Sequence, residues 1–327
     1  MLPEPFANLR RLRRTPALRA MTCETHLTPE QLILPLFVGG GPTRRTPLPA
    51  LPGVDLLCGE DIPRAAQGAW DTGLKSVLLF GVLGPDRKDP RGTCSTDPTN
   101  PVCQAIERIR QQQPGMVVIA DLCLCEYTSH GHCGILQGGQ IDNAQTLAVL
   151  AEAAVNLARA GADMIAPSGV MDGTVRTLRQ ALDAAGFGDV ALMPYSAKFA
   201  SGFYGPFKEA SQSTPAESLH CTHQIAVGNQ REALRKIWVD VEEGADLVIV
   251  KPALTALDIL ALARERNCPV PLVGYDVSGF YRPLVETYGM GTSRCDALMM
   301  ELLTCMCRAG AQMIITYHAR QAAGLLR

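Results

Sequence analysis

Cysteine and histidine side chains crowd one short stretch of the chain, DLCLCEYTSHGHC. Cys123, Cys125 and Cys133 have the spacing C-x-C-x7-C, which allows three thiolates to converge on one ion. His130 or His132 is the candidate for a fourth ligand of a structural zinc site. If neither histidine binds, the zinc keeps an open position, where it can polarise a carbonyl group or activate a water. The stretch therefore predicts a zinc site.

Two lysines end apolar segments that follow each other along the chain, in YSAKFAS and VIVKPA. The chain has only six lysines against 24 arginines, so the placement of Lys198 and Lys251 is selective. Adjacent ammonium groups in a desolvated pocket lower each other's pKa, towards ~7–8 in catalytic sites. The neutral amine then attacks a carbonyl group to form an imine. Either lysine alone could instead pair with an acidic residue, but together they predict Schiff-base chemistry.

Eight short apolar segments rich in β-branched residues predict the strands that carry these side chains. Helical spacing between most of them, as in residues 143–161, 231–244 and 294–310, favours parallel pairing. No glycine-rich dinucleotide turn follows the first strand, so the sequence predicts an α/β fold of the closed (β/α)8 TIM-barrel type. The predicted strands are residues 32–38, 76–82, 117–124, 164–169, 191–198, 247–253, 271–279 and 313–319.

Residues 1–30 precede the first predicted strand and carry five arginines between Arg10 and Arg19. This segment predicts an extended N-terminal arm, followed by a catalytic barrel over residues 31–327. The arm is either a solvated tail or a contact with a neighbouring subunit. Aromatic residues do not alternate with its charges, which argues against an RNA-binding patch.

The amino-acid composition indicates which kinds of molecule the protein binds. With 30 Lys+Arg against 32 Asp+Glu, the net charge of −2 gives no bulk attraction for nucleic acid or an acidic membrane. No apolar stretch has the length of a signal peptide core or a membrane span. In such a chain the twelve cysteines predict reduced thiols rather than disulfides. We expect a cytoplasmic protein that acts on a small molecule, with neither nucleic acid nor membrane as partner.

Barrel enzymes carry their chemistry at the carboxyl ends of the strands. Besides the lysines and cysteines, the predicted strands deliver Asp121, Ser168, Ser278 and Tyr317 there.

A barrel with two neighbouring lysines and a three-cysteine loop resembles the porphobilinogen synthase family, also called 5-aminolaevulinate dehydratase. In that family two molecules of 5-aminolaevulinate condense to the pyrrole porphobilinogen with loss of two waters, early in the synthesis of haem and other tetrapyrroles. The resemblance implies a zinc-dependent lyase and a homo-octamer. It spans nearly the whole chain through the motifs RRLRRTPALRAM, LILPLFV, DLCLCEYTSHGHCG, YSAKFASGFYGPF, EEGADLVIVKPAL, VSGFY and RAGAQMIITYHA.

The resemblance also implies roles for individual residues. Lys251 would hold one substrate as an imine, with the carboxylate of that substrate on Ser278 and Tyr317. Lys198 would bind the second substrate, which zinc on the three cysteines would activate, and Asp121 would shuttle protons. Further residues implied to bind substrate are Phe203, Tyr204, Lys208, His220 and Gln224.

The chain departs from the family pattern where the second substrate's carboxylate would bind. Lys208 stands where arginine is usual, and His220 and Cys221 replace a basic pair, although Gln224 is kept. Neither lysine nor neutral histidine reproduces the two-pronged pairing of arginine with a carboxylate, in which each charge-assisted bond contributes roughly 1.5–3 kcal/mol. We therefore expect a weakened second site.

Three further departures are Gly169, Thr174 and Phe280, which stand where the family usually has Asp, Arg and Glu. They predict altered subunit contacts or an altered site for the allosteric Mg²⁺ that the resemblance admits.

Three functions fit these observations. The first is a porphobilinogen synthase with a relaxed second site. The second is a divergent paralogue that condenses 5-aminolaevulinate, or a similar aminoketone, with a partner lacking the usual carboxylate. The third is a non-catalytic protein that binds 5-aminolaevulinate or zinc. A metal-free class I aldolase would leave the cysteines unexplained.

Overall fold

The computed structural model describes residues 9–213 and 222–327, so the predicted site residues His220 and Cys221 lie outside the described residues. The strands are β1 (Leu32–Gly39), β2 (Arg44–Pro47), β3 (Asp55–Cys58), β4 (Ser76–Val82), β5 (Val117–Leu122), β6 (Leu136–Gln137), β7 (Gln140–Ile141), β8 (Met164–Pro167), β9 (Ala191–Leu192), β10 (Ala197–Lys198), β11 (Val248–Lys251), β12 (Leu272–Tyr275) and β13 (Met313–Ile315). The α-helices are α1 (Pro16–Met21), α2 (Asp61–Asp71), α3 (Pro101–Gln112), α4 (Asn143–Ala160), α5 (Thr174–Ala184), α6 (Gly205–Ala210), α7 (Gln230–Glu242), α8 (Leu257–Glu265), α9 (Ser278–Tyr288), α10 (Ser293–Ala309) and α11 (Ala319–Leu325).

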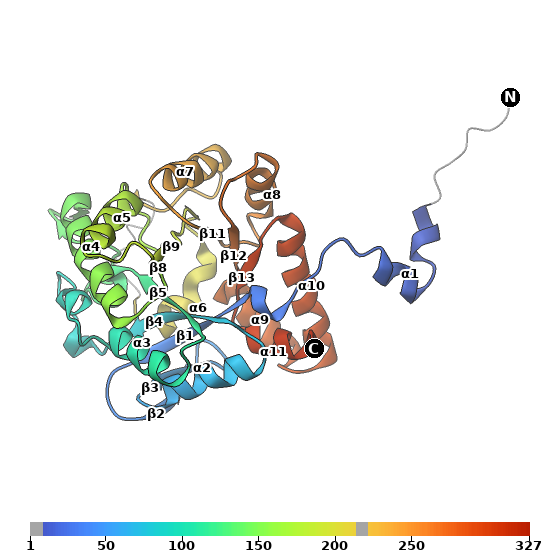
Figure 1. Ribbon diagram of the computed structural model, residues 1–327, viewed down its shortest axis with the longest axis horizontal. Helices are drawn as coiled ribbons and strands as arrows, with labels where there is room; N and C mark the ends of the chain where they lie inside the picture. Colours follow the sequence, from blue (N-terminus) through green and yellow to red (C-terminus); the bar gives the residue numbers. More distant parts are fainter. Residues whose placement is uncertain (1–8, 214–221) are drawn as a thin grey trace.

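The main sheet is parallel and curls into a barrel that the helices surround (Figure 1). Its strand order is β10-β11-β12-β13-β1-β4-β5-β8-β9. The two end strands come from one stretch, residues 191–198, whose backbone bonds to both neighbours. Met193 and Tyr195 donate N–H groups to carbonyls of β8, and the Pro194 carbonyl accepts from Ile249 in β11. This stretch closes the predicted (β/α)8 barrel, which is confirmed.

The predicted strand at 191–198 divides into β9 and β10. Pro194 lies between them and has no N–H to donate, so regular pairing stops there. The predicted strands 247–253, 271–279 and 313–319 were also too long, because each included residues beyond the last residue of β11, β12 or β13. The hairpin β2–β3, which pairs with β1, was not predicted.

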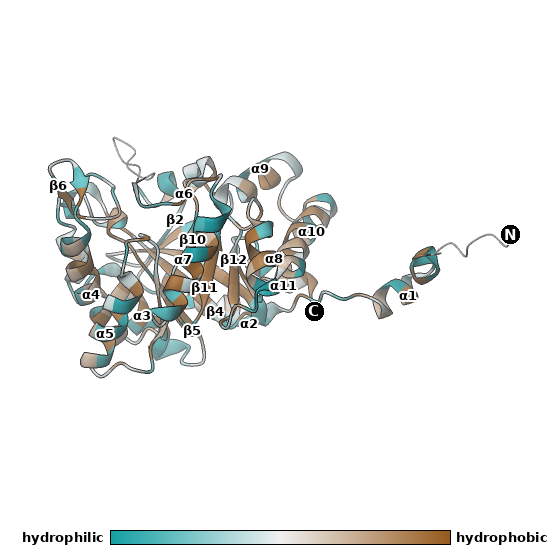
Figure 2. Cartoon of the chain, turned by 90° about the horizontal axis from the view of Figure 1, so that it is seen from above, coloured by the Kyte–Doolittle hydropathy of each residue, from teal (hydrophilic) through white to brown (hydrophobic). Residues whose placement is uncertain are grey.

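Alternate residues of each strand separate the core into two layers. In β1, Leu34 and Leu36 face the cluster between strands and helices, whereas Ile33 and Phe37 face the barrel interior. The apolar colour gathers on strands such as β11 and β12 inside the helices (Figure 2). Both faces of the strands are therefore buried, which explains their continuous apolar runs.

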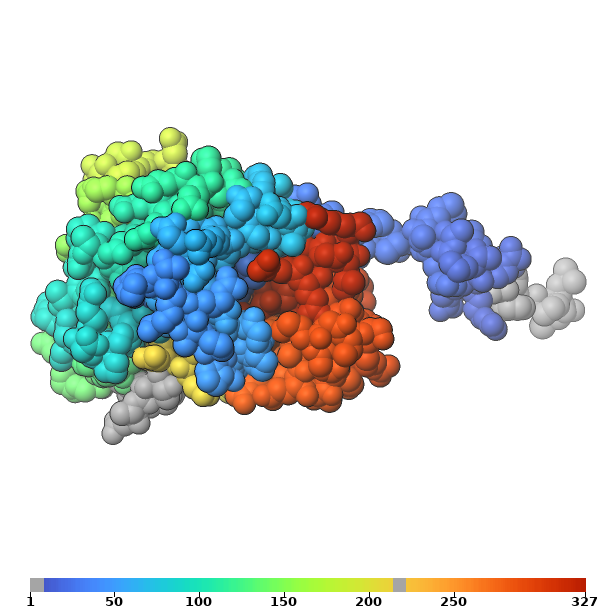
Figure 3. All heavy atoms as spheres, turned by 90° about the horizontal axis from the view of Figure 1, so that it is seen from below, coloured from blue at the N-terminus to red at the C-terminus, as the bar shows by residue number. Residues whose placement is uncertain are grey.

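The segment before the barrel lies apart from it. The 3-10 helix Leu9–Arg13 and α1 have no buried residue, and Figures 1 and 3 show both extending away from the barrel. Leu9 and Met21 are more than two-thirds exposed, at 74% and 73%. Within the described residues, no helix has both the length and the apolar character needed to cross a membrane.

Candidate active site

Three cysteine thiols converge at the carboxyl end of β5. Cys123 follows the strand directly, Cys125 lies in the 3-10 turn Leu124–Glu126, and Cys133 returns from the loop beyond. Their Sγ atoms all lie within 4.8 Å of one another, and Cys123 and Cys133 are buried. Three sulfur ligands at this separation suit a soft tetrahedral cation such as Zn²⁺ and leave one position for a fourth ligand.

The histidines of the loop contribute no atom to this three-thiol group. His130 Nε2 lies 3.1 Å from the Pro90 carbonyl, which can only accept, so this nitrogen donates. His130 Nδ1 in turn accepts from the backbone N–H of His132 at 3.1 Å. Both ring nitrogens of His130 therefore bind backbone atoms, one of Pro90 and one of His132, in place of a metal ion.

The two lysines lie side by side at the same end of the barrel. Lys198 ends β10, Lys251 ends β11, and the two residues are direct partners in the register. Both are buried, with 7% and 4% of their surface exposed. Lys198 Nζ donates to the Ser168 carbonyl at 2.5 Å. The parallel register thus places both amines in one buried pocket.

Aromatic rings surround the Lys251 amine. The ring of Tyr275 lies 3.9 Å from Nζ and that of Phe207 lies 4.9 Å away. Tyr195 and Tyr204 complete the enclosure at 5.1 and 5.2 Å. Ring faces attract a cation, but they offer it no hydrogen-bond acceptor. This enclosure removes water from the amine.

Burial and the neighbouring Lys198 lower the pKa of Lys251 to about 7, against an opposing attraction from Asp121. Lys198 behaves differently. Burial is the largest single influence and lowers its pKa, but the thiols of Cys133, Cys123 and Cys125 and the Asp121 carboxyl group together raise the pKa above its usual value. The two pKa values are therefore shifted in opposite directions, whereas the sequence had predicted that each amine lowers the pKa of the other.

A buried carboxyl group lies beside the lysines. Asp121 is the second-last residue of β5, near the thiols, and its Oδ2 accepts a hydrogen bond from the Ser168 hydroxyl at 3.0 Å. Burial and Cys123 raise the pKa of Asp121 to about 7, although Lys198 and Lys251 oppose the rise. A carboxyl group with this pKa can give and take protons near neutral pH.

A small cavity of about 30 Å³ is lined by both lysines and by Cys125 and Cys133. Since that volume holds about one water, side chains must move to admit a substrate. Sequence reasoning missed two of its lining residues, Phe207 and Ser213, because only the folding of α6 and of the residues that follow it brings them to the cavity. The lining residues are Cys125, Cys133, Lys198, Tyr204, Phe207, Lys208, Ser213, Gln224 and Lys251.

The remaining predicted residues lie near this cavity. Ser278 Oγ accepts from the N–H of Phe207 at 3.0 Å and contacts the carbonyl of Phe203 at 3.4 Å. The Tyr317 hydroxyl lies 3.5 Å from that of Tyr275. Phe203 is 42% exposed, and its ring stacks on that of Phe280. Neither residue lines the cavity. The Phe203 side chain therefore lies at the edge of the site.

The chain is similar to proteins of known family over nearly its full length. A family model described as delta-aminolevulinic acid dehydratase matches residues 6–325. Relatives of that name from Bacillus subtilis and Synechococcus elongatus are 42% and 44% identical, each over 98% of both chains. The Toxoplasma gondii delta-aminolevulinic acid dehydratase (porphobilinogen synthase), solved in complex with porphobilinogen, aligns with a TM-score of 0.95 at 37% identity over 99% of this chain and 92% of that chain. Together with the paired lysines and the three-thiol group, these similarities show that the chain belongs to the delta-aminolevulinic acid dehydratase family.

Proposed function

We propose that this protein is a porphobilinogen synthase, a lyase that condenses two molecules of 5-aminolaevulinate to porphobilinogen with loss of two waters. The observation that carries the proposal is the pairing of Lys198 with Lys251 in one buried pocket beside three converging thiols. The names of the full-length relatives support the same activity. Tetrapyrrole synthesis is the process in which this product is used.

Lys251 is the residue that binds the first substrate covalently. Its neutral amine attacks the ketone carbon, and loss of water leaves an imine. Ser278 and Tyr317 hold the carboxylate of that substrate, since they follow the neighbouring strands β12 and β13. Burial and the charge of Lys198 favour the neutral amine before the attack, and the ring faces stabilise the cationic imine after it.

The second substrate binds on the opposite side of Lys251, near Lys198. Lys198 keeps its charge, so it donates hydrogen bonds to that substrate, and Asp121 exchanges protons with the reacting groups. Cys123, Cys125 and Cys133 would hold Zn²⁺, which supplies a Lewis acid that polarises the second substrate. Thiol ligands favour zinc over magnesium, so the allosteric Mg²⁺ stays a separate prediction.

Porphobilinogen formation tests the proposal. We expect reduced, zinc-loaded protein to form porphobilinogen when 5-aminolaevulinate is raised to high millimolar concentration, and to stop when zinc is chelated. Cys133→Ser should lose both bound zinc and activity, because serine replaces one of three thiolate ligands, whereas the exposed Cys23→Ser should keep both. Zinc content is read by elemental analysis. Imine formation without porphobilinogen would favour the divergent paralogue, and unchanged activity without zinc would contradict the metal assignment.

Lys208 tests the binding of the second carboxylate. This residue is half-buried at the cavity, where burial lowers its pKa and weakens it as an anion anchor. Lys208→Arg should lower KM about tenfold by restoring a two-pronged pairing, and Lys208→Met should raise KM by a similar factor. Lys75→Met is the matched control, because Lys75 directly precedes the amino end of β4, whereas the site lies at the carboxyl ends of the strands. If Lys208→Met leaves KM unchanged, a partner without that carboxylate becomes the better assignment.

We propose that the protein forms a homo-oligomer through its N-terminal arm. The family resemblance implies that this oligomer is an octamer. Leu9, Leu12 and Met21 are exposed apolar side chains on a segment that contacts little of its own barrel. Contact with a second subunit would bury them. Removing residues 1–21 should reduce the mass measured by light scattering, because that contact is lost. An unchanged mass would contradict a role of the arm in assembly.

A further inference from the structure

A buried carboxyl group at the end of β12 has no part in the mechanism above. Asp276 is 2% exposed, and its Oδ2 accepts a hydrogen bond from the Thr316 hydroxyl at 2.8 Å. Within the described part of the chain, Oδ1 has no hydrogen-bond partner. Burying a carboxyl group with half of its acceptors unused is unfavourable. The single hydrogen bond that the Asp276 side chain makes, in addition to the backbone bond from its N–H to the Ile315 carbonyl, therefore needs an explanation.

That bond joins two strand ends just beyond their regular pairing. The β12–β13 register ends at Tyr275 and Ile315, so Asp276 and Thr316 are the next residues along each strand. The Thr316 hydroxyl also accepts the backbone N–H of His318 at 3.1 Å. It thus ties the turn 316–318 to Asp276. Tyr317 is the central residue of this turn.

The same bond relates two carboxylate-binding residues. Ser278 follows Asp276 by two positions, and Tyr317 follows Thr316 by one. Ser278 and Tyr317 follow different strands. Within the described residues, their side chains make no hydrogen bond to each other. The hydrogen bond between Asp276 and Thr316 is therefore a direct side-chain link between the two segments that carry them.

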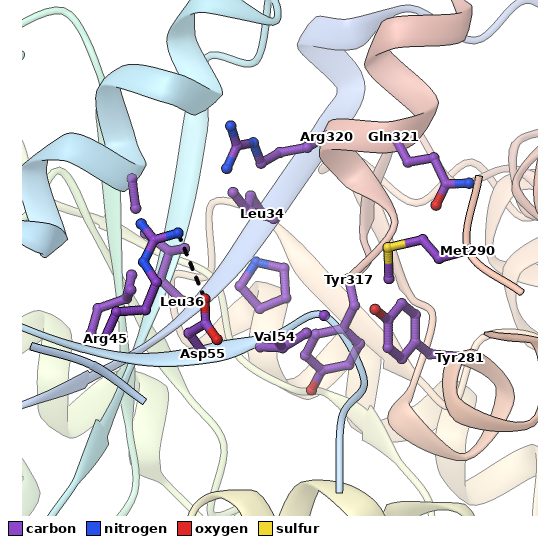
Figure 4. Close-up of a pocket in the computed structure, with 14 residues that line it drawn as sticks. Leu34, Leu36, Arg45, Val54, Asp55, Tyr281, Met290, Tyr317, Arg320 and Gln321 are labelled. Carbon is purple, nitrogen blue, oxygen red and sulfur yellow. Dashed lines mark ion pairs between the residues drawn. The ribbon is translucent and has the colours of Figure 1, made fainter. Parts of the chain in front are cut away.

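Packing does not hold Tyr317 on every side. A cavity of about 270 Å³ borders its ring and that of Tyr281, and Figure 4 shows both rings beside Met290 with Arg320 and Gln321 beyond. Among residues 9–213 and 222–327, the one hydrogen-bond contact of the Tyr317 hydroxyl is the long one of 3.5 Å to Tyr275. The rings of Phe37 and Tyr281 contact the Tyr317 ring, at centroid distances of 6.3 and 5.2 Å, and the cavity leaves part of that ring without a neighbour among the described residues. The backbone turn therefore contributes, together with these two rings, to the direction of the Tyr317 side chain.

We propose that Asp276 and Thr316 are positioning residues that hold Ser278 and Tyr317 at the separation required by the carboxylate of a linear keto acid. The inference rests on the proposed function, in which that pair binds the carboxylate of the first substrate. Loss of the link lowers the affinity for a ketone that carries the carboxylate. It leaves the attack of Lys251 on a ketone without a carboxylate unchanged.

Two probes separate these effects. 4-Oxopentanoate has the ketone and carboxylate of 5-aminolaevulinate without its amine, and pentan-2-one lacks the carboxylate as well. Each is trapped on Lys251 with cyanoborohydride, and the half-saturating concentration is read by peptide mass spectrometry. Trapping of pentan-2-one also reports a folded lysine pocket.

The variants are chosen in pairs. Thr316→Val removes the hydroxyl at nearly constant size, and Thr316→Ser keeps it. Asp276→Asn keeps an acceptor for Thr316. The double variant Asp276→Leu with Thr316→Val removes both partners of the bond together, which avoids leaving either one buried alone and guards against an unfolded single variant.

We expect Thr316→Val and the double variant to raise the half-saturating concentration of 4-oxopentanoate about tenfold, with that of pentan-2-one unchanged. Thr316→Ser and Asp276→Asn should stay within about threefold of the unchanged protein. Equal losses for both ketones, or no loss for either, would overturn the inference while leaving the proposed function intact. If the unchanged protein itself shows no preference for 4-oxopentanoate, the assignment of Ser278 and Tyr317 fails, and the inference fails with it.

Discussion

The cost of burying two lysine amines side by side is the constraint on which the site depends. Two buried ammonium groups repel each other, and neither can reach water. The fold resolves this by giving the amines different surroundings. Lys251 lies among aromatic rings and loses its charge readily, whereas Lys198 lies near thiols and donates to the Ser168 carbonyl. A nucleophile and a cation thus result from the same type of side chain.

The barrel makes this arrangement possible because each strand of the closed sheet is paired with a neighbour on both sides, which fixes its register. Lys198 and Lys251 are partners only because the stretch 191–198 bonds both β8 and β11, which closes the barrel. The same carboxyl ends bring Asp121 and the thiols of the β5 loop next to the lysines. The groups come from β5, β10 and β11, so the closed sheet positions them relative to one another.

The sequence predicted the barrel, the three cysteines and the two lysines, because each has a local signal: an apolar run, a short spacing or a rare residue at a strand end. It did not predict what depends on the fold in three dimensions. Phe207 and Tyr275 enclose Lys251 from separate elements, and the ring nitrogens of His130 bind the backbone of its own loop and of Pro90. The division of the strand at Pro194 could have been predicted from the proline itself, but the continuous apolar run around it favoured one unbroken strand.

Mapping the imine formed with 5-aminolaevulinate is the most direct test of the central claim, that Lys251 is the neutral amine of the pair. The substrate is trapped with cyanoborohydride over a range of pH, and the modified peptide is identified by mass spectrometry. A lysine loses its proton as pH rises through its pKa, so the adduct should form on Lys251 with a rate that increases through about pH 7, leaving Lys198 unmodified. An adduct on Lys198, or trapping confined to strongly alkaline pH, would contradict the account.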